Sequence, residues 1–376
     1  MIEIDEPLAR LKAAADDPWM AVREAKEQGR PVVGCVPYFF PLELVHASGA
    51  LPVELWGGGK LTGAASSYYP AFYCSVLFTL MERALDGSYD DLDAVVVPTT
   101  CDGLRNLEEN WKYARTDMEV IDFVQPAVRT TIQSHEYQKG QLERVAKRLS
   151  EATGIKVTER AIRESIAAYN RQRAAMRMFS KVAADHVNVI DSRTRQQVFA
   201  AARSLPVEEH TALVERLNEA LQEQPVCEPE GAKVVLTGVL VDSPSVLSEL
   251  DSNGLSVVGD LTLSESVRYA TDVPGRIDPF DSLATVWEDV RGASVALDPK
   301  KERGLMLADL VRERNAQGVV ACIVKFCEEE EFDVPVLKQQ LDAEGIPILL
   351  LEVEMQDAES EQAATRIQAF AELLDA

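Results

Sequence analysis

The sequence lacks closely spaced metal ligands and is short of positive charge. It has no Cys-x-x-Cys pair, and its four histidines, His46, His135, His186 and His210, are scattered. Structural zinc sites use closely spaced cysteines and histidines, so a zinc finger is excluded. Lys and Arg number 38 against 62 Asp and Glu, which gives a formal net charge of -24. This balance argues against non-specific binding to nucleic acid or to an anionic membrane surface.

Long apolar runs are also missing. No run approaches the roughly 20 residues that a membrane-spanning helix needs. The first residues, 1–6, have neither the basic start nor the apolar stretch of a secretory signal, so we expect a cytoplasmic protein. The length of 376 residues is enough for two α/β domains and too great for a typical single one.

The chain does contain six cysteines: Cys35, Cys74, Cys101, Cys227, Cys322 and Cys327. Disulfides are disfavoured in the reducing cytoplasm, so metal binding or buried packing must explain these residues. Without zinc-finger spacing, an iron–sulfur cluster is the remaining common use of well-separated thiolates.

Short β-branched runs alternate with helical patterns at both ends of the chain, which predicts an α/β fold with parallel sheets. Expected strands cover residues 31–36, 52–56, 94–97, 119–124, 233–241, 256–258, 294–297, 318–325 and 346–352. Expected helices cover residues 6–29, 41–48, 102–113, 243–252, 302–316, 335–344 and 359–374. Residues 137–224 read as long charged helices with almost no strand signal. We therefore predict an N-terminal α/β domain (1–136), a helical bridging segment (137–225) and a C-terminal α/β domain with a closing helix (226–376).

Two cysteines directly follow predicted strands. Cys101 comes after the run 94–97, and Cys327 after the run 318–325. Ligands of open α/β sheets gather outside the carboxyl ends of strands, so both thiols can share a site in the cleft between the domains. Cys74 opens a predicted helix, where the helix dipole favours a thiolate. The alternative, equally weighted for each, is a buried cysteine that only fills space.

The other cysteines are expected to be inert. Cys35 and Cys322 lie inside predicted strands, and Cys227 lies between two prolines on a polar loop. His46 is expected to be an ordinary interior histidine.

Two acidic features and a glycine triplet are open to simple explanations. Glu43 follows the proline that starts a helix, so it either complements the helix dipole or acts as an acid–base group. Residues 328–331 are four consecutive glutamates, which predicts a solvated face. Residues 57–59 are three glycines without phosphate-loop spacing, and we interpret them as a flexible turn.

Several motifs together resemble the 2-hydroxyacyl-CoA dehydratase and benzoyl-CoA reductase family. They are Pro-Leu-Glu-Leu-Val-His-Ala-Ser-Gly-Ala-Leu-Pro-Val at residues 41–53, Thr-Cys-Asp-Gly-Leu-Arg-Asn-Leu at 100–107, Lys-Phe-Cys at 325–327, Pro-Val-Leu at 335–337 and Gly-Ile-Pro at 345–347. Each motif is weak alone. Their order and spacing over most of the chain make the set specific for the superfamily.

The resemblance implies two flavodoxin-like domains that hold one 4Fe-4S cluster in their cleft through Cys74, Cys101 and Cys327. In this family Glu43 would be an acid–base residue or a neighbour of the cluster, and Ser75 and Asp102 would orient the ligands. The implied partners are an acyl-CoA substrate, a homologous second subunit or a second copy in a homodimer, and an ATP-dependent iron–sulfur activator. Residues that bind the CoA phosphates are not assigned, because no phosphate loop is visible.

The implied reaction of a dehydratase is radical elimination of water. An open iron position engages the thioester carbonyl, and a ketyl radical then expels the hydroxyl group. The alternatives are a benzoyl-CoA reductase-type subunit, a cluster-bearing electron-transfer or structural subunit whose partner does the chemistry, and a scaffold without a cluster.

Overall fold

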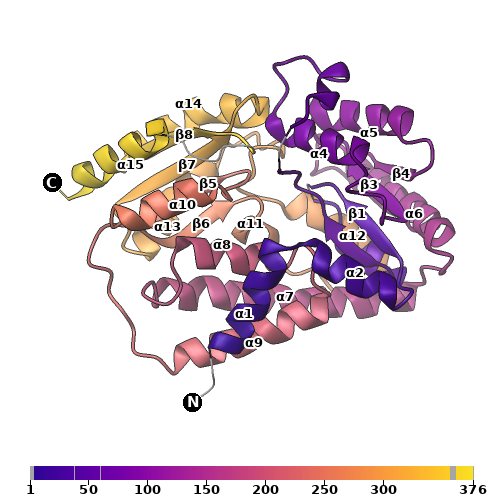
Figure 1. Ribbon diagram of the computed structural model, residues 1–376, viewed down its shortest axis with the longest axis horizontal. Coiled ribbons are helices and arrows are strands. Elements are labelled where there is room, and N and C mark those ends of the chain that lie inside the picture. The colour runs from indigo at the N-terminus through magenta and orange to yellow at the C-terminus, as the bar shows by residue number, and fades with distance from the viewer. Residues whose placement is uncertain (1–3, 38, 60, 356–360, 376) are drawn as a thin grey trace.

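The computed structural model describes residues 4–37, 39–59, 61–355 and 361–375, which form two four-stranded parallel sheets (Figure 1). The first sheet has the order β2-β1-β3-β4 and the second the order β6-β5-β7-β8. Each therefore has the 2-1-3-4 order that begins a flavodoxin-like sheet. The strands are β1 (Val32–Cys35), β2 (Leu51–Glu54), β3 (Ala94–Pro98), β4 (Glu119–Phe123), β5 (Lys233–Gly238), β6 (Ser256–Thr262), β7 (Gly318–Val324) and β8 (Ile348–Val353).

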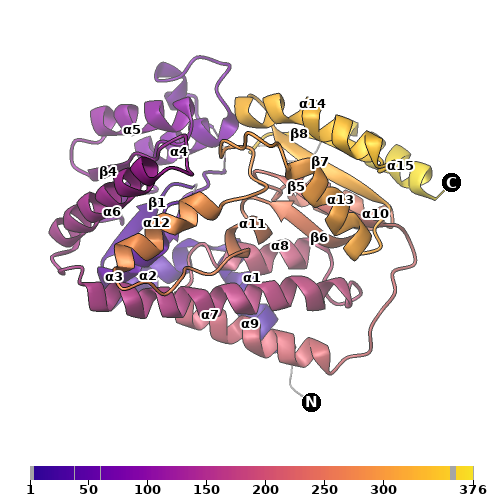
Figure 2. The same cartoon turned by 180° about the vertical axis from the view of Figure 1, so that it is seen from behind.

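Helices flank both sheets, and the long helix α7 bridges them. It contacts α3 beside the first sheet, and β6 and α11 of the second unit. With α9 it runs along one side of the molecule in both views (Figures 1 and 2). The helices are α1 (Asp5–Asp16), α2 (Trp19–Glu27), α3 (Leu42–Ala47), α4 (Ser75–Leu85), α5 (Asp102–Ala114), α6 (Ile132–Thr153), α7 (Glu159–Ala184), α8 (Ser192–Ala201), α9 (Val207–Gln222), α10 (Pro244–Ser252), α11 (Ser266–Tyr269), α12 (Pro279–Asp289), α13 (Arg303–Glu313), α14 (Glu328–Ala343) and α15 (Glu361–Leu374), with a 3-10 turn η1 (Ala64–Ser67).

Eight of the nine predicted strands are confirmed in position, and residues 294–297 are not a strand. The buried side chains of Val295 and Ala296 explain why the segment resembles one. Its polar groups are instead used by side chains from elsewhere: the Arg129 guanidinium donates to the carbonyl oxygen of Leu297 at 3.0 Å, and the Ser294 hydroxyl donates to Glu330.

Two helix predictions are also corrected. The expected helix 6–29 is two helices, α1 and α2, because Pro18 has no amide hydrogen to continue α1 and instead precedes the first turn of α2. The expected helix 335–344 begins earlier, at Glu328, and runs through Pro335. Four acidic residues in its first turn complement the positive end of the helix dipole. Helix α12 was not predicted.

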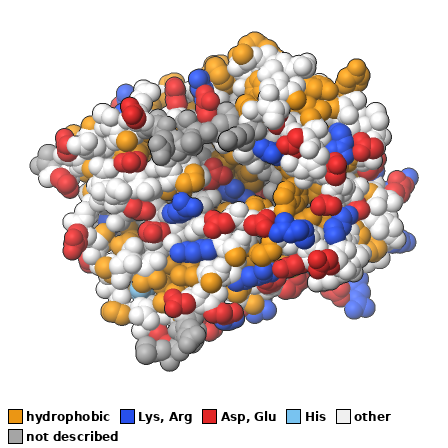
Figure 3. Space-filling model, in the orientation of Figure 1, with side chains coloured by type: hydrophobic (Ala, Val, Ile, Leu, Met, Phe, Trp, Pro, Cys, Tyr) orange, Lys and Arg blue, Asp and Glu red, His pale blue; other side chains and the backbone are white. Residues whose placement is uncertain are grey.

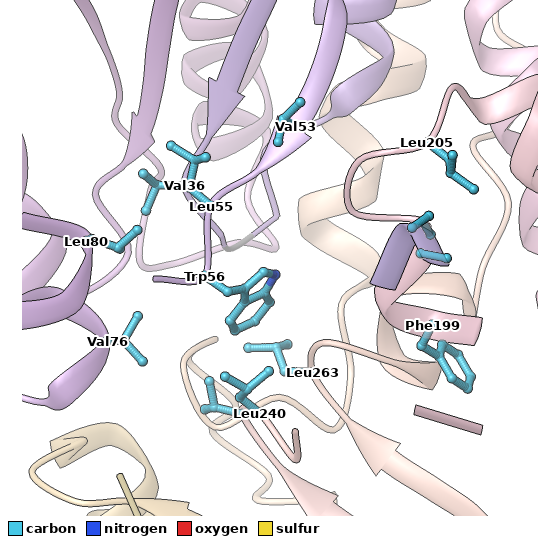
Figure 4. Packing of buried hydrophobic residues seen from close by; sticks show 14 of the residues in the cluster. Val36, Val53, Leu55, Trp56, Val76, Leu80, Phe199, Leu205, Leu240 and Leu263 are labelled. Atoms are coloured by element: carbon cyan, nitrogen blue, oxygen red, sulfur yellow. The ribbon is translucent and has the colours of Figure 1, made fainter. Parts of the chain in front are cut away.

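An apolar cluster joins the two sheets. Trp56, just after β2, lies between Val76 and Leu80 of α4 on one side and Leu240 and Leu263 of the second unit on the other (Figure 4). Full burial of a large apolar side chain contributes about 1.5–3 kcal/mol, so these contacts favour a fixed arrangement of the two units. None of the described helices is both long and apolar enough to span a membrane.

A buried charge group lies at the end of β6. Arg195 of α8 forms ion pairs with Asp260 and Glu265, and all three side chains are almost fully buried. One guanidinium group therefore pairs with two carboxylate groups. Burial raises the pKa of Glu265 to about 7, and the nearby charge of Asp260 adds to this while Arg195 opposes it.

We expect Glu265→Gln to reduce the pH dependence of stability. The pKa of Glu265 is higher in the folded chain than the value of about 4.3 in an unfolded one. Glu265 therefore contributes fully to the free energy of unfolding below pH 4.3, and this contribution is lost as the pH rises to 7. Between pH 4.5 and 7.5 the wild type should lose on the order of 3 kcal/mol more unfolding free energy than the variant. Urea denaturation at both pH values measures this. Glu219→Gln, at an exposed position, should keep the wild-type slope.

Candidate functional site

Three cysteines occupy the same structural position in three elements. Cys74, Cys101 and Cys327 are the residues immediately before α4, α5 and α14. The Cys101 sulfur accepts a hydrogen bond from the backbone N–H of Leu104 at 3.4 Å. Unpaired N–H groups and the helix dipole make each helix start a favourable place for a thiolate.

The fold brings these three thiols together from both units. Cys101 follows β3 and Cys327 follows β7, and a negative charge on Cys74 would raise the pKa of each. All three belong to or pack against the apolar cluster around Trp56. The Ser75 hydroxyl accepts a hydrogen bond from the N–H of Met355 at 3.0 Å, which ties the start of α4 to the segment after β8.

The arrangement suits a group larger than one ion. Among the described residues, no three His, Cys, Asp or Glu side chains converge to hold a single metal ion. In an iron–sulfur cubane each thiolate binds a different iron atom, so the sulfur atoms need not meet at one point. Three cysteines at helix starts fit such a cluster, because thiolates are its ordinary ligands.

The thiols are protonated in the metal-free chain. Burial raises the pKa of Cys101 to about 12 and also raises the pKa values of Cys74 and Cys327. Hydrogen bonds from the helix-start N–H groups lower these pKa values in part. Metal binding must therefore release protons, as it does at thiolate sites in general.

The glutamate run after Cys327 is only in part the solvated face that the sequence predicts: Glu328 and Glu331 are exposed, but the other two are not. Glu330 is 1% exposed and accepts a hydrogen bond from Arg303 of α13 at 2.8 Å. Glu329 is half-buried, with a carboxylate oxygen 3.9 Å from the Cys327 sulfur, and its charge acts on Cys74 and Cys101 as well. Nothing in four consecutive glutamates distinguishes these two, so Glu329 was missed.

Two phenylalanines beside the site have strained backbones. Phe326, directly before Cys327, has φ 62°, and Phe39 has φ 56°. Non-glycine residues rarely adopt this left-handed region, and such outliers cluster at functional sites. The strain at Phe326 turns the chain between β7 and α14 and so sets the position of Cys327.

A cavity of about 810 Å³ lies between the two units. Glu43 of α3 lines it, is 1% exposed, and pairs with Arg173 of α7 at 2.6 Å. The three cysteines are not among the lining residues, but Trp56 belongs both to the cavity wall and to their apolar cluster. Figure 3 shows the face of the molecule that is turned to the viewer in Figure 1. Acidic and basic side chains are mixed on this face, and several Lys and Arg side chains lie across its middle.

The other residues considered from the sequence lie in strands or in contact with ordinary polar neighbours. Cys35 and Cys322 are buried within β1 and β7. His46 contacts Ser165 at 2.9 Å and Glu208 at 3.2 Å. Asp102 is exposed, and its carboxylate lies 3.8 Å from the guanidinium of Arg105.

The glycine turn and Cys227 are more constrained than expected. Gly57 has φ 82°, and a side chain there would collide with the Thr79 hydroxyl, so the turn is fixed by packing against α4 rather than simply flexible. Cys227 forms an isolated bridge with His186 on a loop, away from the other cysteines in sequence.

The family model described as "2-hydroxyglutaryl-CoA dehydratase, D-component" matches residues 37–374. The chain belongs to this family. It is 37% identical to lactoyl-CoA dehydratase subunit beta of Anaerotignum propionicum, over 100% of both chains. It is 34% identical to the (R)-phenyllactyl-CoA dehydratase beta subunit of Clostridium sporogenes, over 97% of both, and 34% identical to (R)-2-hydroxyglutaryl-CoA dehydratase subunit beta of Acidaminococcus fermentans, over 98% of both. This D-component chain is therefore an enzyme subunit of the dehydratase type, as the sequence motifs predicted.

Proposed function

We propose that the chain is the iron–sulfur subunit of a dehydratase that removes water from a 2-hydroxyacyl-CoA to give a 2-enoyl-CoA. The observation that carries the proposal is that three thiols from both α/β units, each at a helix start, belong to or pack against one apolar cluster; Cys327 is buried, and Cys74 and Cys101 are half-buried. The three relatives described above are all named as dehydratase subunits, which favours dehydration over ring reduction.

Cys74, Cys101 and Cys327 would bind one 4Fe-4S cluster. When bound, such a cluster supplies a one-electron carrier and an iron atom with an open coordination position. The chain contributes the environment: the apolar cluster around Trp56 excludes water, and the low dielectric strengthens polar contacts with a ligand. Glu43, held by Arg173 in the cavity wall, is the candidate acid–base residue.

We propose two protein partners. The relatives are called beta subunits, which supports a homologous second subunit. The reaction also needs a low-potential electron, for which we propose an ATP-dependent iron–sulfur activator. The acyl-CoA substrate would enter the cavity between the units, whose volume is within the usual range for ligand sites.

One observation favours a second candidate, an electron-transfer subunit whose partner binds the substrate. The cavity wall includes Trp56 but none of the three cysteines. Binding of acyl-CoA by this chain alone supports the first candidate, and binding only by the partner subunit supports the second.

Anaerobic purification with determination of iron and acid-labile sulfide tests the cluster. We expect about four of each per chain, the content of a single cubane. About eight irons would indicate a double cubane. If neither element is found even after reconstitution, the cluster proposal is wrong and a scaffold role is the better account.

A further inference from the structure

One carboxylate beside the three cysteines has no cation to balance it. Glu329 lies in the first turn of α14, two residues after Cys327, and its side chain is half-buried. One of its carboxylate oxygens is 3.9 Å from the Cys327 sulfur. Within the part of the chain that the structure describes, no Lys, Arg or His side chain forms an ion pair with Glu329. A partly buried carboxylate in such a position lacks a partner of opposite charge.

The other three glutamates of this turn have their charge or hydrogen bonds satisfied. Glu330 forms a buried ion pair with an arginine of α13 at 2.8 Å. The Glu331 carboxylate accepts a hydrogen bond from the backbone N–H of Phe326 at 3.0 Å. Glu328 is exposed, so water solvates it. An exposed acidic side chain is enough to complement the helix dipole, so the dipole alone does not explain why Glu329 is turned toward a thiol.

The charge of Glu329 also reaches the two thiols of the first unit. A negative charge on Glu329 raises the pKa of Cys74 and of Cys101. Glu329 is therefore within electrostatic range of all three proposed cluster ligands, although it belongs to the second unit. The neighbouring charges that act most strongly on Glu329 itself, Asp102 and Glu330 among them, are also negative.

Deprotonation of the three cysteines makes this position unfavourable unless a metal compensates it. Like charges about 4 Å apart repel strongly in a partly buried site. A cubane held by three thiolates leaves one iron atom without a protein sulfur. Carboxylate oxygen is an ordinary ligand of protein-bound iron. A bond to that iron would give Glu329 the cation that it lacks.

We propose that Glu329 is the fourth protein ligand of the cluster, and that its carboxylate binds the iron atom that the three cysteines leave free. The inference rests on the proposed function in one respect, namely that Cys74, Cys101 and Cys327 hold one 4Fe-4S cluster. The fourth iron position is then closed to water in the chain without substrate. An incoming oxygen ligand forms its bond to iron as the bond from Glu329 breaks, and no atom changes its oxidation state.

EPR spectroscopy of the anaerobic, reduced full chain in water enriched in ¹⁷O tests the proposal. Water or hydroxide on the fourth iron broadens the cluster signal through hyperfine coupling to ¹⁷O, whereas a carboxylate ligand does not. We expect the wild-type linewidth to be the same in ordinary and enriched water. Glu329→Gln should show broadening, because a neutral amide is a weak ligand for iron and water takes its place.

Cyanide binding to the same samples provides a second measurement. Cyanide and Glu329 would compete for one iron, and a ligand tethered within the chain competes at a high effective concentration. The dissociation constant for cyanide should therefore be lower in Glu329→Gln than in the wild type, by about tenfold or more. The matched control is Glu328→Gln, which removes the same charge from the same helical turn at an exposed position. It should keep the wild-type linewidth and cyanide affinity.

Iron content separates this inference from the cluster proposal. Three thiolates are enough to hold a cubane, so Glu329→Gln should keep about four irons per chain. If the iron-loaded wild type is broadened by ¹⁷O as much as the variant, water occupies the iron and the inference is wrong, with the proposed function intact. Equal cyanide affinity without broadening in either protein also overturns it. A wild type without iron after reconstitution overturns the proposed function, and this inference with it.

Discussion

Replacing Cys327 with alanine is expected to remove nearly all cluster iron from the anaerobic protein, from about four atoms per chain to less than one. Cys327 is the proposed ligand from the second unit, and the other two, Cys74 and Cys101, come from the first. Two thiolates from one unit do not hold a cubane that spans both. Iron and acid-labile sulfide per chain, with the visible absorption of the cluster, measure the loss.

Cys322→Ala is the matched control for this prediction. Cys322 lies on the same strand–helix segment, is buried in β7, and packs in the core of the second sheet. The variant removes a thiol and a similar volume but should keep its iron. Equal iron content in the Cys327→Ala variant and the wild type would show that Cys327 is not a ligand. Iron loss in both variants would mean that damage to the fold, not removal of a ligand, explains the result.

The strands that carry the site were predictable because each is a short β-branched run bounded by turn residues. Val95, Val96 and Val97 mark β3, and Val319 and Val320 mark β7. Ligands of parallel sheets bind near the carboxyl ends of the strands. The order of residues along the chain was therefore enough to predict that Cys101 and Cys327 lie at the carboxyl ends of β3 and β7. The sequence order also places Cys74 before a helix, where the structure has it.

The environment of these residues was not predictable, because it depends on partners far away in the sequence. Glu43 is paired with a residue 130 positions later, Arg173, and Glu330 with Arg303 on another helix. A run of four glutamates normally faces water, and the buried guanidinium of Arg303 and the hydroxyl of Ser294 make it possible for Glu330 to be an interior residue. Helix α12 is different: Asp278 as its N-cap and Pro279 in its first turn are readable signals that were overlooked.

Replacing Arg303 with methionine is expected to lower the free energy of unfolding by about 3–5 kcal/mol. Its guanidinium binds Glu330 at 2.8 Å, Asp333 at 3.3 Å and the Thr237 hydroxyl at 2.9 Å, and all of these partners are buried. Methionine fills much of the volume but leaves two carboxylates without that cation, and Lys301 reaches only Asp333. Urea denaturation of the purified chain measures the change.

Arg312→Met provides the matched control, because Arg312 lies on the same helix, α13, and pairs with Glu344 at the surface. Its side chain is 55% exposed, so water already screens the pair and the variant should lose less than about 1 kcal/mol. A similar small loss for Arg303→Met would contradict the prediction. A large loss of unfolding free energy in Arg303→Met, with a small loss in Arg312→Met, would support a specific role for the Arg303–Glu330 ion pair. This pair joins α13 to the first turn of α14, the helix that Cys327 precedes.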